Sequence, residues 1–408
     1  MRFEDALRSV YARIPLGMRL GLAAMEEACA RLGHPEQAFP TVHVAGTNGK
    51  GSVAAMVEAI AREHGLRTGL FTSPHLARFA ERIQIDGQPI GDGALLAVLE
   101  RAITGGADLS FFETTTLAAF LAFREAKVDI AVVEVGLGGR LDATNVIPSP
   151  RAACITRIAF DHMDKLGKSL VEIGREKAGI AKPGLDIVTG PLDPAVREAI
   201  RETAGAIGAT LTSAEQDPSA LAFTKTAKVG LSGAHQLENA RVAYLLGRRL
   251  GADEDACARG IAGVRWPGRL ETIVTHDGAV LLDAAHNPDG VASLVAHVTG
   301  LAIPETKLAL VFGVLADKEW REMQDALARG FSRRFYVTPA THARSAMPPA
   351  DLASRHAGSV CPSVPDALRE ARSAVGPEGL VVIAGSIMLV GEARSLLLGL
   401  PRDPPVAM

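Results

Sequence analysis

The residues Gly46-Thr47-Asn48-Gly49-Lys50-Gly51-Ser52 form a glycine-rich run of the kind that binds phosphate. Glycines let backbone amides wrap an anion, and the start of a following helix adds positive potential. Lys50 would neutralise phosphate charge, and Ser52 would offer its hydroxyl to Mg²⁺. The spacing departs from the usual G-x-x-x-x-G-K-[ST] pattern, because Val44 occupies the first glycine position. The run predicts nucleotide binding, whereas its glycines alone would indicate only a tight turn.

Other residues that could bind a metal or take part in catalysis lie at or after the ends of expected strands. Glu134 lies near the carboxyl end of a buried strand, where α/β sheets place ligand groups. A buried carboxylate is costly without a partner, so a metal ion is one explanation and a core salt bridge is the other. His162 follows another strand end, and Lys177 lies on a downstream helix. Taken alone, His162 could be structural and Lys177 could be a surface lysine on a helix, and Asp142 in its glycine-rich turn could be only a turn former.

Two regions of alternating strands and helices position these residues. In the first region we expect strands at 41–45, 70–72, 129–135, 153–158 and 186–188, with a helix at 114–127. In the second we expect strands at 279–282, 308–312, 335–337 and 380–384, with helices at 320–329 and 366–374. This order predicts an α/β protein. We expect a P-loop-type domain with a mostly parallel sheet, of the kind found in ATPase domains (residues 1–267), to precede a smaller Rossmann-like α/β domain (268–408), with a hinge at 266–269. The turn at 283–288 lacks G-x-G-x-x-G, which disfavours dinucleotide binding.

Composition excludes several classes of function. The 408 residues include 43 basic and 46 acidic ones, for a net charge of −3, and only 4% are aromatic. Neither a basic face nor a set of base-stacking rings follows, so no nucleic acid is expected as partner. The four cysteines form no C-x-x-C pair, which disfavours zinc and disulfides. No apolar segment of signal-peptide or membrane length is found, which predicts a cytoplasmic protein without a membrane partner.

The run at 44–52 resembles the phosphate loop of the Mur ligase superfamily, in its folylpolyglutamate synthase and dihydrofolate synthase branch. The likeness continues in the same order along nearly the whole chain. It includes 72–76 with 81–83, 134–145, 161–162 with 166–167, 175–180, 235–240, 283–288 and 385–386. Several independent motifs in one order make the resemblance specific.

The resemblance implies a set of site residues. Lys50, His162 and Lys177 would be catalytic, and two Mg²⁺ ions would be held by Ser52, Glu134, His162 and a carbamylated Lys177. A monovalent cation such as K⁺ is also allowed. The pterin would be bound by Thr72, Ser73, Pro74, His75, Asp142 and Ala143.

The remaining implied residues bind ATP and glutamate. With the phosphate loop, ATP would be contacted by His235, Asn239, Arg269, Asp283 and His286. The incoming glutamate would be contacted by His286, Lys318 and Ser386. Four of these residues have a plainer interpretation: helix capping or packing for His235 and Asn239, and a solvated charge for Arg269 and Lys318.

The activity implied is ATP-dependent ligation of L-glutamate to dihydropteroate, forming dihydrofolate, and to the γ-carboxyl of folates, through an acyl phosphate. The resemblance also implies a monomer acting on small molecules. A folylpolyglutamate synthase without the first activity remains an alternative. A cell-wall Mur ligase is disfavoured, because no separate UDP-binding domain precedes residue 46. A GTP switch or other nucleotide-regulated binding protein is disfavoured, because Thr224-Lys225 and Thr306-Lys307 lack the following aspartate of a guanine motif.

Overall fold

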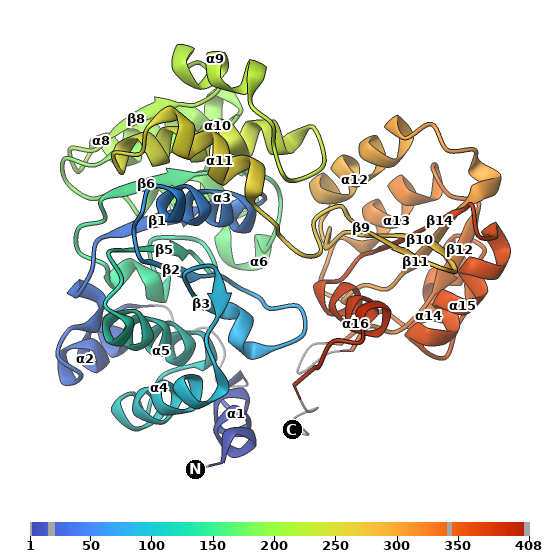
Figure 1. Ribbon diagram of the computed structural model, residues 1–408, viewed down its shortest axis with the longest axis horizontal. Coiled ribbons are helices and arrows are strands. Elements are labelled where there is room, and N and C mark those ends of the chain that lie inside the picture. Colours follow the sequence, from blue (N-terminus) through green and yellow to red (C-terminus); the bar gives the residue numbers. More distant parts are fainter. Residues whose placement is uncertain (1, 15–20, 341–344, 404–408) are drawn as a thin grey trace.

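The computed structural model describes residues 2–14, 21–340 and 345–403. These residues form a larger N-terminal lobe and a smaller C-terminal lobe, each built on one sheet (Figure 1). Residues 264–270 link the last helix of the first lobe to the first strand of the second. The prediction of an α/β fold with two mostly parallel sheets is confirmed.

The N-terminal sheet has the strand order β4-β3-β2-β5-β1-β6-β7-β8. In the part of the sheet ordered β2-β5-β1-β6-β7-β8, each strand is parallel to its neighbours in that part. At the other edge, β3 pairs antiparallel with β2 and β4 pairs antiparallel with β3. The strands are β1 (Thr41–Ala45), β2 (Thr68–Phe71), β3 (Ile83–Ile85), β4 (Gln88–Pro89), β5 (Ile130–Glu134), β6 (Ala152–Ile155), β7 (Asp186–Thr189) and β8 (Thr210–Ser213).

Helices cover both faces of this sheet because successive side chains of each strand point in opposite directions. In β5, Ile130 and Val132 pack toward α3 (Lys50–Glu63), α10 (His235–Arg249) and α11 (Glu254–Gly263). The intervening Ala131 and Val133 pack in the opposite core. That second layer contains α1 (Phe3–Tyr11), α2 (Ala23–Arg31), α4 (Asp92–Gly105) and α5 (Phe111–Ala126), and continues with α7 (Leu170–Ala178) and α8 (Pro194–Gly205). The short α6 (Met163–Leu166) precedes α7, and α9 (Pro218–Thr226) packs on α10.

The C-terminal sheet has the order β13-β12-β11-β14-β10-β9, with only β9 antiparallel to its neighbour among the described strands. Its strands are β9 (Glu271–Thr275), β10 (Gly278–Leu282), β11 (Leu308–Phe312), β12 (Arg333–Tyr336), β13 (Ser359–Val360) and β14 (Leu380–Ala384). One face packs on α12 (Pro288–Gly300), α13 (Trp320–Ala328) and α14 (Pro349–Arg355), and the other on α15 (Val364–Val375) and α16 (Ile387–Leu398).

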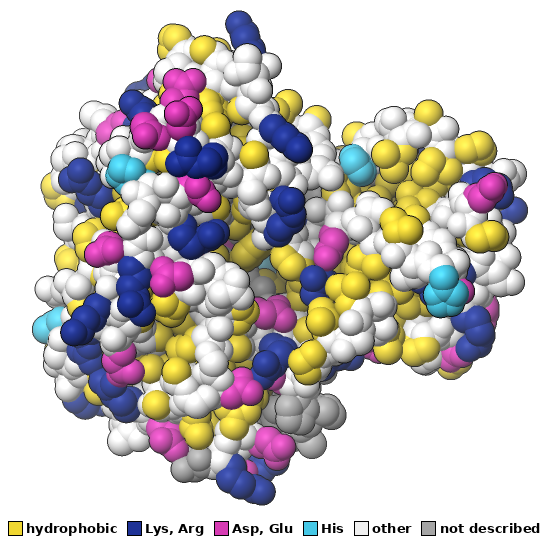
Figure 2. Space-filling model, in the orientation of Figure 1, with side chains coloured by type: hydrophobic (Ala, Val, Ile, Leu, Met, Phe, Trp, Pro, Cys, Tyr) yellow, Lys and Arg dark blue, Asp and Glu magenta, His cyan; other side chains and the backbone are white. Residues whose placement is uncertain are grey.

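The surface matches the near-neutral charge balance. Figure 2 shows Lys and Arg side chains interspersed with Asp and Glu over the face in view. All four cysteines are buried and free. Within the described part of the chain, no helix combines the length and apolar character needed to cross a bilayer.

Candidate active site between the two lobes

The phosphate loop joins β1 to α3, as its sequence predicts. Gly46 has a φ of 145° and Gly49 a φ of 90°, a region that favours glycine. A Cβ on Gly46 would overlap Thr156 Oγ1, and one on Gly49 would lie 2.5 Å from Asn239 Oδ1. Gly49 is also the N-cap of α3 and brings no side chain to it. The first amide groups of a 14-residue helix are therefore left available for an anion.

The segment after β6 holds the loop in shape. The Thr47 N–H donates to the Arg157 carbonyl at 2.8 Å, and the Thr156 hydroxyl donates to the Asn48 carbonyl at 2.7 Å. The Thr47 hydroxyl donates to the Ala159 carbonyl at 3.1 Å. The chain itself thus preorganises the loop around the place where phosphate would bind.

Glu134, at the end of β5, faces this loop. Its Oε1 lies 4.0 Å from Lys50 Nζ, and its Oε2 accepts a hydrogen bond from the Ser73 N–H at 3.1 Å. Burial raises the pKa of Glu134, and the charge of Lys50 opposes that rise. Lys50 Nζ also donates to the Thr47 carbonyl at 3.2 Å. A carboxylate and an ammonium are therefore held beside the phosphate loop.

Lys177 reaches the same cavity from α7. The helix starts with a capping box in which the Ser169 hydroxyl accepts from the Glu172 N–H at 3.2 Å. Lys177 is only 4% exposed, and burial, helped by the nearby Lys50, lowers its pKa to about 7. Among the described residues, none forms a hydrogen bond or ion pair with its amine. A lysine in this setting can exist as a neutral amine, the form that reacts with carbon dioxide.

The donor set fits Mg²⁺ that arrives with a nucleotide. Ser52, Glu134, His162 and Lys177 line one cavity. Within the described residues, no three His, Cys, Asp or Glu side chains are grouped closely enough to hold a metal by themselves. Mg²⁺ commonly takes one or two protein oxygens and completes its shell with phosphate and water. The buried Glu134 carboxylate and the Ser52 hydroxyl suit that mode of binding.

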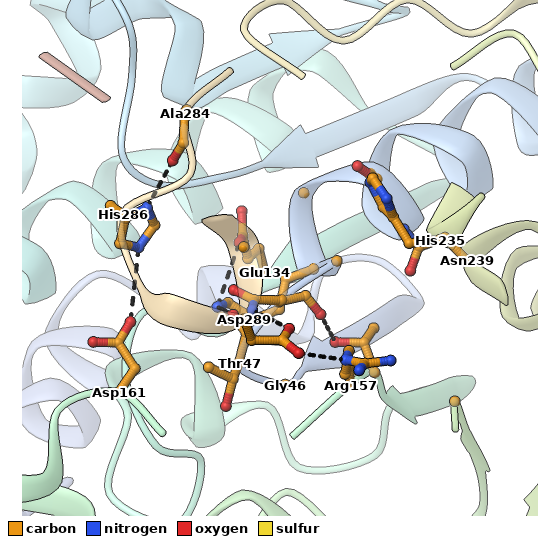
Figure 3. A pocket seen from close by; sticks show the side chains of 18 of the residues that line it. Gly46, Thr47, Glu134, Arg157, Asp161, His235, Asn239, Ala284, His286 and Asp289 are labelled. Carbon is orange, nitrogen blue, oxygen red and sulfur yellow. Dashed lines mark hydrogen bonds and ion pairs between the residues drawn. The ribbon is translucent and has the colours of Figure 1, made fainter. Parts of the chain in front are cut away.

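The opposite wall of the cavity comes from the C-terminal lobe. Asp283 accepts hydrogen bonds from the Leu270 N–H at 2.9 Å and the Ala285 N–H at 3.0 Å. Burial raises the pKa of Asp283, and Arg269 opposes this shift. His286 Nδ1 lies 2.8 Å from the Ala284 carbonyl (Figure 3). The resulting cavity has a volume of about 210 Å³ and is lined from both lobes.

The two lobes are also joined directly at the phosphate loop. Asn48 and Asn287 exchange amide hydrogen bonds of 3.2 and 2.9 Å. Asn48 Nδ2 donates to Asp289 Oδ2 at 2.7 Å, and Arg157 Nε donates to Asp289 Oδ1 at 2.9 Å (Figure 3). The sequence predicts that Asn48 contacts ATP as part of the phosphate loop, and it predicts no role for Arg157, Asn287 or Asp289. The match at 283–288 was the available signal for Asn287.

His235 and Asn239, both on α10, lie at another side of this cavity (Figure 3). Asn239 Nδ2 donates to Gln236 Oε1 at 2.9 Å, and Gln236 Nε2 donates to Ser52 Oγ at 3.3 Å. Gln236 therefore links Asn239, an expected ATP contact, to the phosphate loop, and residue type alone does not single it out.

A second cavity of about 470 Å³ adjoins the first, and Pro74 lines both. Thr72 and His75 line the second cavity, and Ser73 the first. His75 is held firmly, because Arg82 Nε donates to its Nδ1 at 2.8 Å and Tyr11 Oη lies 3.3 Å from its Nε2. The segment expected to bind the pterin thus forms a packed wall.

Four predicted residues lie apart from these cavity walls. Asp142 Oδ2 accepts from the Leu137 N–H at 2.9 Å, and its Oδ1 accepts from the Thr144 N–H and hydroxyl at 3.0 and 2.6 Å. Neither Asp142 nor Ala143 lines either cavity, so their pterin role stays a prediction. Lys318 and Ser386 line neither cavity. Ser386, however, is the N-cap of α16, whose Ile387 lines both.

Family models match both lobes. Residues 44–247 match the Mur ligase middle domain, and residues 268–387 match the glutamate ligase domain of Mur ligases. The chain belongs to the Mur ligase family, in its dihydrofolate synthase/folylpolyglutamate synthase branch.

Two curated relatives illustrate the likeness. A Bacillus subtilis dihydrofolate synthase/folylpolyglutamate synthase is 33% identical, over 97% of this chain and 99% of that protein. A probable bifunctional folylpolyglutamate synthase/dihydropteroate synthase of Halobacterium salinarum is 36% identical over 97% of this chain. This chain spans only 52% of the length of the Halobacterium protein.

Solved structures are similar over nearly their whole length. Escherichia coli FolC in complex with DHPP and ADP aligns with a TM-score of 0.84 and 30% identity, over 93% of this chain and 94% of that one. A bifunctional folylpolyglutamate synthase/dihydrofolate synthase from Yersinia pestis, complexed with AMPPNP and Mn ion, aligns with a TM-score of 0.82 and 29% identity, over 94% of this chain and 95% of that one.

Proposed function

We propose that this protein ligates L-glutamate to dihydropteroate, forming dihydrofolate, and to the γ-carboxyl of folates, with ATP as energy source. The observation that carries the proposal is the cavity between the lobes. There a phosphate loop with Lys50 and Glu134 faces Arg269 and His286 of the glutamate ligase domain. The names of the relatives, and the ADP and DHPP bound to the FolC structure, support the same substrates.

The first chemical step brings two anions together. The carboxylate of the pterin substrate attacks the γ-phosphate of ATP, giving an acyl phosphate and ADP. Lys50 lies in the loop that would hold the phosphates, and Arg269 lines the same cavity from the other lobe. Their positive charges offset the repulsion between the reactants and the charge that develops on the transferring phosphoryl group.

Ser52, Glu134, His162 and a carbamylated Lys177 would hold two Mg²⁺ ions, and the Mn ion of the Yersinia structure supports the use of a divalent cation. When bound, these ions supply further charge neutralisation at the phosphates. Carbamylation would turn Lys177 from a poorly solvated cation into an oxygen ligand of negative charge. A monovalent cation such as K⁺ would be a further cofactor beside the two Mg²⁺ ions.

The second step forms the amide. The neutral amine of L-glutamate attacks the carbonyl carbon of the acyl phosphate, the bond from that carbon to the phosphate oxygen breaks, inorganic phosphate leaves and the nitrogen loses one proton. Water must be kept from the acyl phosphate, which favours a site enclosed by two lobes. The hydrogen bonds between Asn48 and Asn287 support such an enclosure, because they join the phosphate loop to the start of α12.

The pterin substrate would lie along the 72–75 segment, which lines the second cavity and reaches the first at Pro74. Asp142 and Ala143 would serve the pterin after a rearrangement of their turn. We propose that both activities are present, with a monofunctional folylpolyglutamate synthase as the alternative. The protein would act as a monomer, since each lobe contributes its own wall to the site within one chain.

Release of ADP by the purified protein tests this proposal. Sustained release of ADP should require ATP, L-glutamate and either dihydropteroate or tetrahydrofolate together, and the product should carry one more glutamate. Activity with tetrahydrofolate but not dihydropteroate would select the monofunctional alternative. ADP formation that depends on neither pterin would contradict the proposal.

A further inference from the structure

A charged cluster lies where the two lobes meet beside the first cavity. Asp161, in the segment between β6 and α6, projects toward the C-terminal lobe. Its Oδ1 lies 2.7 Å from Nζ of Lys318, which follows β11. Its Oδ2 lies 3.7 Å from His286 Nε2 (Figure 3) and 3.5 Å from Asn287 Nδ2. Asp161 thus faces three residues of the other lobe.

The cluster is largely withdrawn from water. The Lys318 side chain is 7% exposed and that of Asp161 is 12% exposed. Removing two charges from water costs free energy that their attraction repays only in part. Asp161 also lines the cavity in which the reacting groups would lie. An ion pair at such a position is suited to exchange partners with a charged ligand.

The His286 ring defines which kind of ligand fits. A carbonyl oxygen can only accept, so His286 Nδ1 donates to Ala284 and the neutral ring carries its lone pair on Nε2. Burial, and secondly Lys318, lower the pKa of His286 to about 3, which keeps the ring neutral. The Nε2 lone pair and Asp161 Oδ2 therefore face each other as two acceptors. A cationic N–H donor placed between them would satisfy both.

We propose that Asp161 binds the α-ammonium group of the incoming glutamate, with His286 Nε2 as second acceptor and Lys318 taking a carboxylate. The inference rests on the proposed function and adds a recognition residue to it. A zwitterion complements the Asp161–Lys318 pair charge for charge. When glutamate binds in this way, its amino nitrogen lies beside Asp161, at the edge of the cavity that would hold the acyl phosphate. The site selects an amino acid over a dicarboxylate of the same length.

Asp161 has a competing role that the test must separate. Its Oδ1 also accepts a hydrogen bond from the His162 N–H at 3.0 Å, and His162 is an expected metal ligand. A residue that acted only by positioning His162 would influence the ATP half-reaction. A residue that binds the ammonium would influence only the glutamate half-reaction.

The experiment compares Asp161→Asn with wild type in both half-reactions. Steady-state kinetics give KM for L-glutamate and Ki for glutarate, which lacks the ammonium. A heavy-oxygen label in the β–γ bridge of ATP scrambles when the acyl phosphate forms reversibly, and is followed with dihydropteroate but no glutamate. Asp164→Asn, an identical change at an exposed position three residues away, is the control.

We expect Asp161→Asn to raise KM for glutamate roughly 10- to 100-fold, as for loss of a hydrogen bond to a charged group. Scrambling and KM for ATP should stay near wild type, and glutarate should bind no worse. Lys318→Met, in contrast, should weaken glutamate and glutarate alike. Asp164→Asn should change none of these values.

Two results would overturn the inference. Slower scrambling with an unchanged KM for glutamate would assign Asp161 to the metal side. Equal weakening of glutamate and glutarate in Asp161→Asn would show that the variant disturbs the carboxylate site instead. If wild-type protein scrambles the label but transfers no glutamate, the proposed function itself fails, and the inference fails with it.

Discussion

At the residue scale, two lysines near the phosphate loop differ in what surrounds them. The Lys50 side chain is 17% exposed, faces Glu134 at 4.0 Å and keeps a hydrogen bond to the loop. Lys177 is 4% exposed, and burial lowers its pKa to about 7. Lys50 therefore lies beside a carboxylate, whereas the environment of Lys177 favours a neutral amine open to modification.

Lys50→Ala should lower kcat on the order of a hundredfold, because it removes a positive charge from the transferring phosphoryl group. The fold should survive, since the polar contacts of the Lys50 side chain with other described residues are one hydrogen bond to Thr47 and the 4.0 Å approach to Glu134. Steady-state kinetics and a thermal unfolding curve check both statements. Lys165→Ala, at an exposed position, is the control. A folded Lys50→Ala protein with wild-type turnover would remove Lys50 from the chemistry.

Lys177→Ala should lose most activity and regain part of it when acetate is added, because a short carboxylate can occupy the place of the carbamate oxygens. Lys177→Arg should be inactive, since it keeps the positive charge and is not readily carbamylated. Mass spectrometry under carbon dioxide would detect the adduct on wild type only. Full activity of Lys177→Arg would refute the carbamate, whatever the alanine variant does.

Asp142 shows what residue type and spacing could not predict. Its sequence context is compatible with a turn former and, by resemblance, with a pterin ligand. In the structure both its carboxylate oxygens accept hydrogen bonds from its own turn, at Leu137 and Thr144. Hydrogen bonds of this kind depend on backbone geometry that no residue pattern specifies.

At the element scale, the elements that carry the site follow strong local patterns. Strands predicted at 41–45, 308–312 and 380–384 have those bounds in the structure, because each is a buried apolar run. The hairpin β3–β4 and the strands β8, β9 and β13 went unpredicted. They are short or partly exposed, as in β9, where Val274 is 78% exposed. Edge strands depend on pairing with a neighbour more than on their own hydrophobic pattern.

Gly46→Ala should destabilise the protein by about 1–3 kcal/mol, since alanine would be strained at this φ and its Cβ would overlap Thr156. ATP binding should weaken as well, because the phosphate loop must shift. Urea unfolding and nucleotide titration measure the two effects. Gly300→Ala is the matched control, as its added Cβ would meet no atom within 4 Å. Equal stability of the two variants would contradict this account of the loop.

At the scale of the whole molecule, distant parts of the chain meet at the site. Asn48 and Asn287 are 239 residues apart and exchange hydrogen bonds. The order of motifs predicted two lobes and their family, but not which side chains join them. Such contacts depend on the orientation of one lobe against the other, which carries no local signal in sequence.

The C-terminal segment makes a further contact between the lobes. Asp403 Oδ2 accepts from the Phe79 N–H at 2.6 Å, and Arg78 Nε lies 3.5 Å from its Oδ1. Leu400 and Pro401 line the second cavity together with residues 74–78. The segment therefore connects the C-terminal lobe to the residues that directly follow 72–75, the segment expected to contact the pterin.

Asp403→Ala should raise KM for dihydropteroate about three- to tenfold and leave KM for ATP unchanged, because the wall loses an anchor of one or two hydrogen bonds. Arg402→Ala is the control, since Arg402 pairs within its own lobe, with Glu392 at 3.6 Å. Steady-state kinetics with each substrate varied in turn measures the effect. Matching KM values for all substrates in both variants would show that this contact does not shape the cavity.

The central claim is that a substrate carboxylate is activated by phosphate transfer at the cavity between the lobes. Dihydropteroate carrying a heavy-oxygen label in its carboxyl group tests it most directly. An acyl phosphate predicts that a labelled oxygen moves from the carboxyl group to the released inorganic phosphate, in step with amide formation and only when ATP and glutamate are both present. Amide formation with all of the label left in the pterin product and in water would contradict the account.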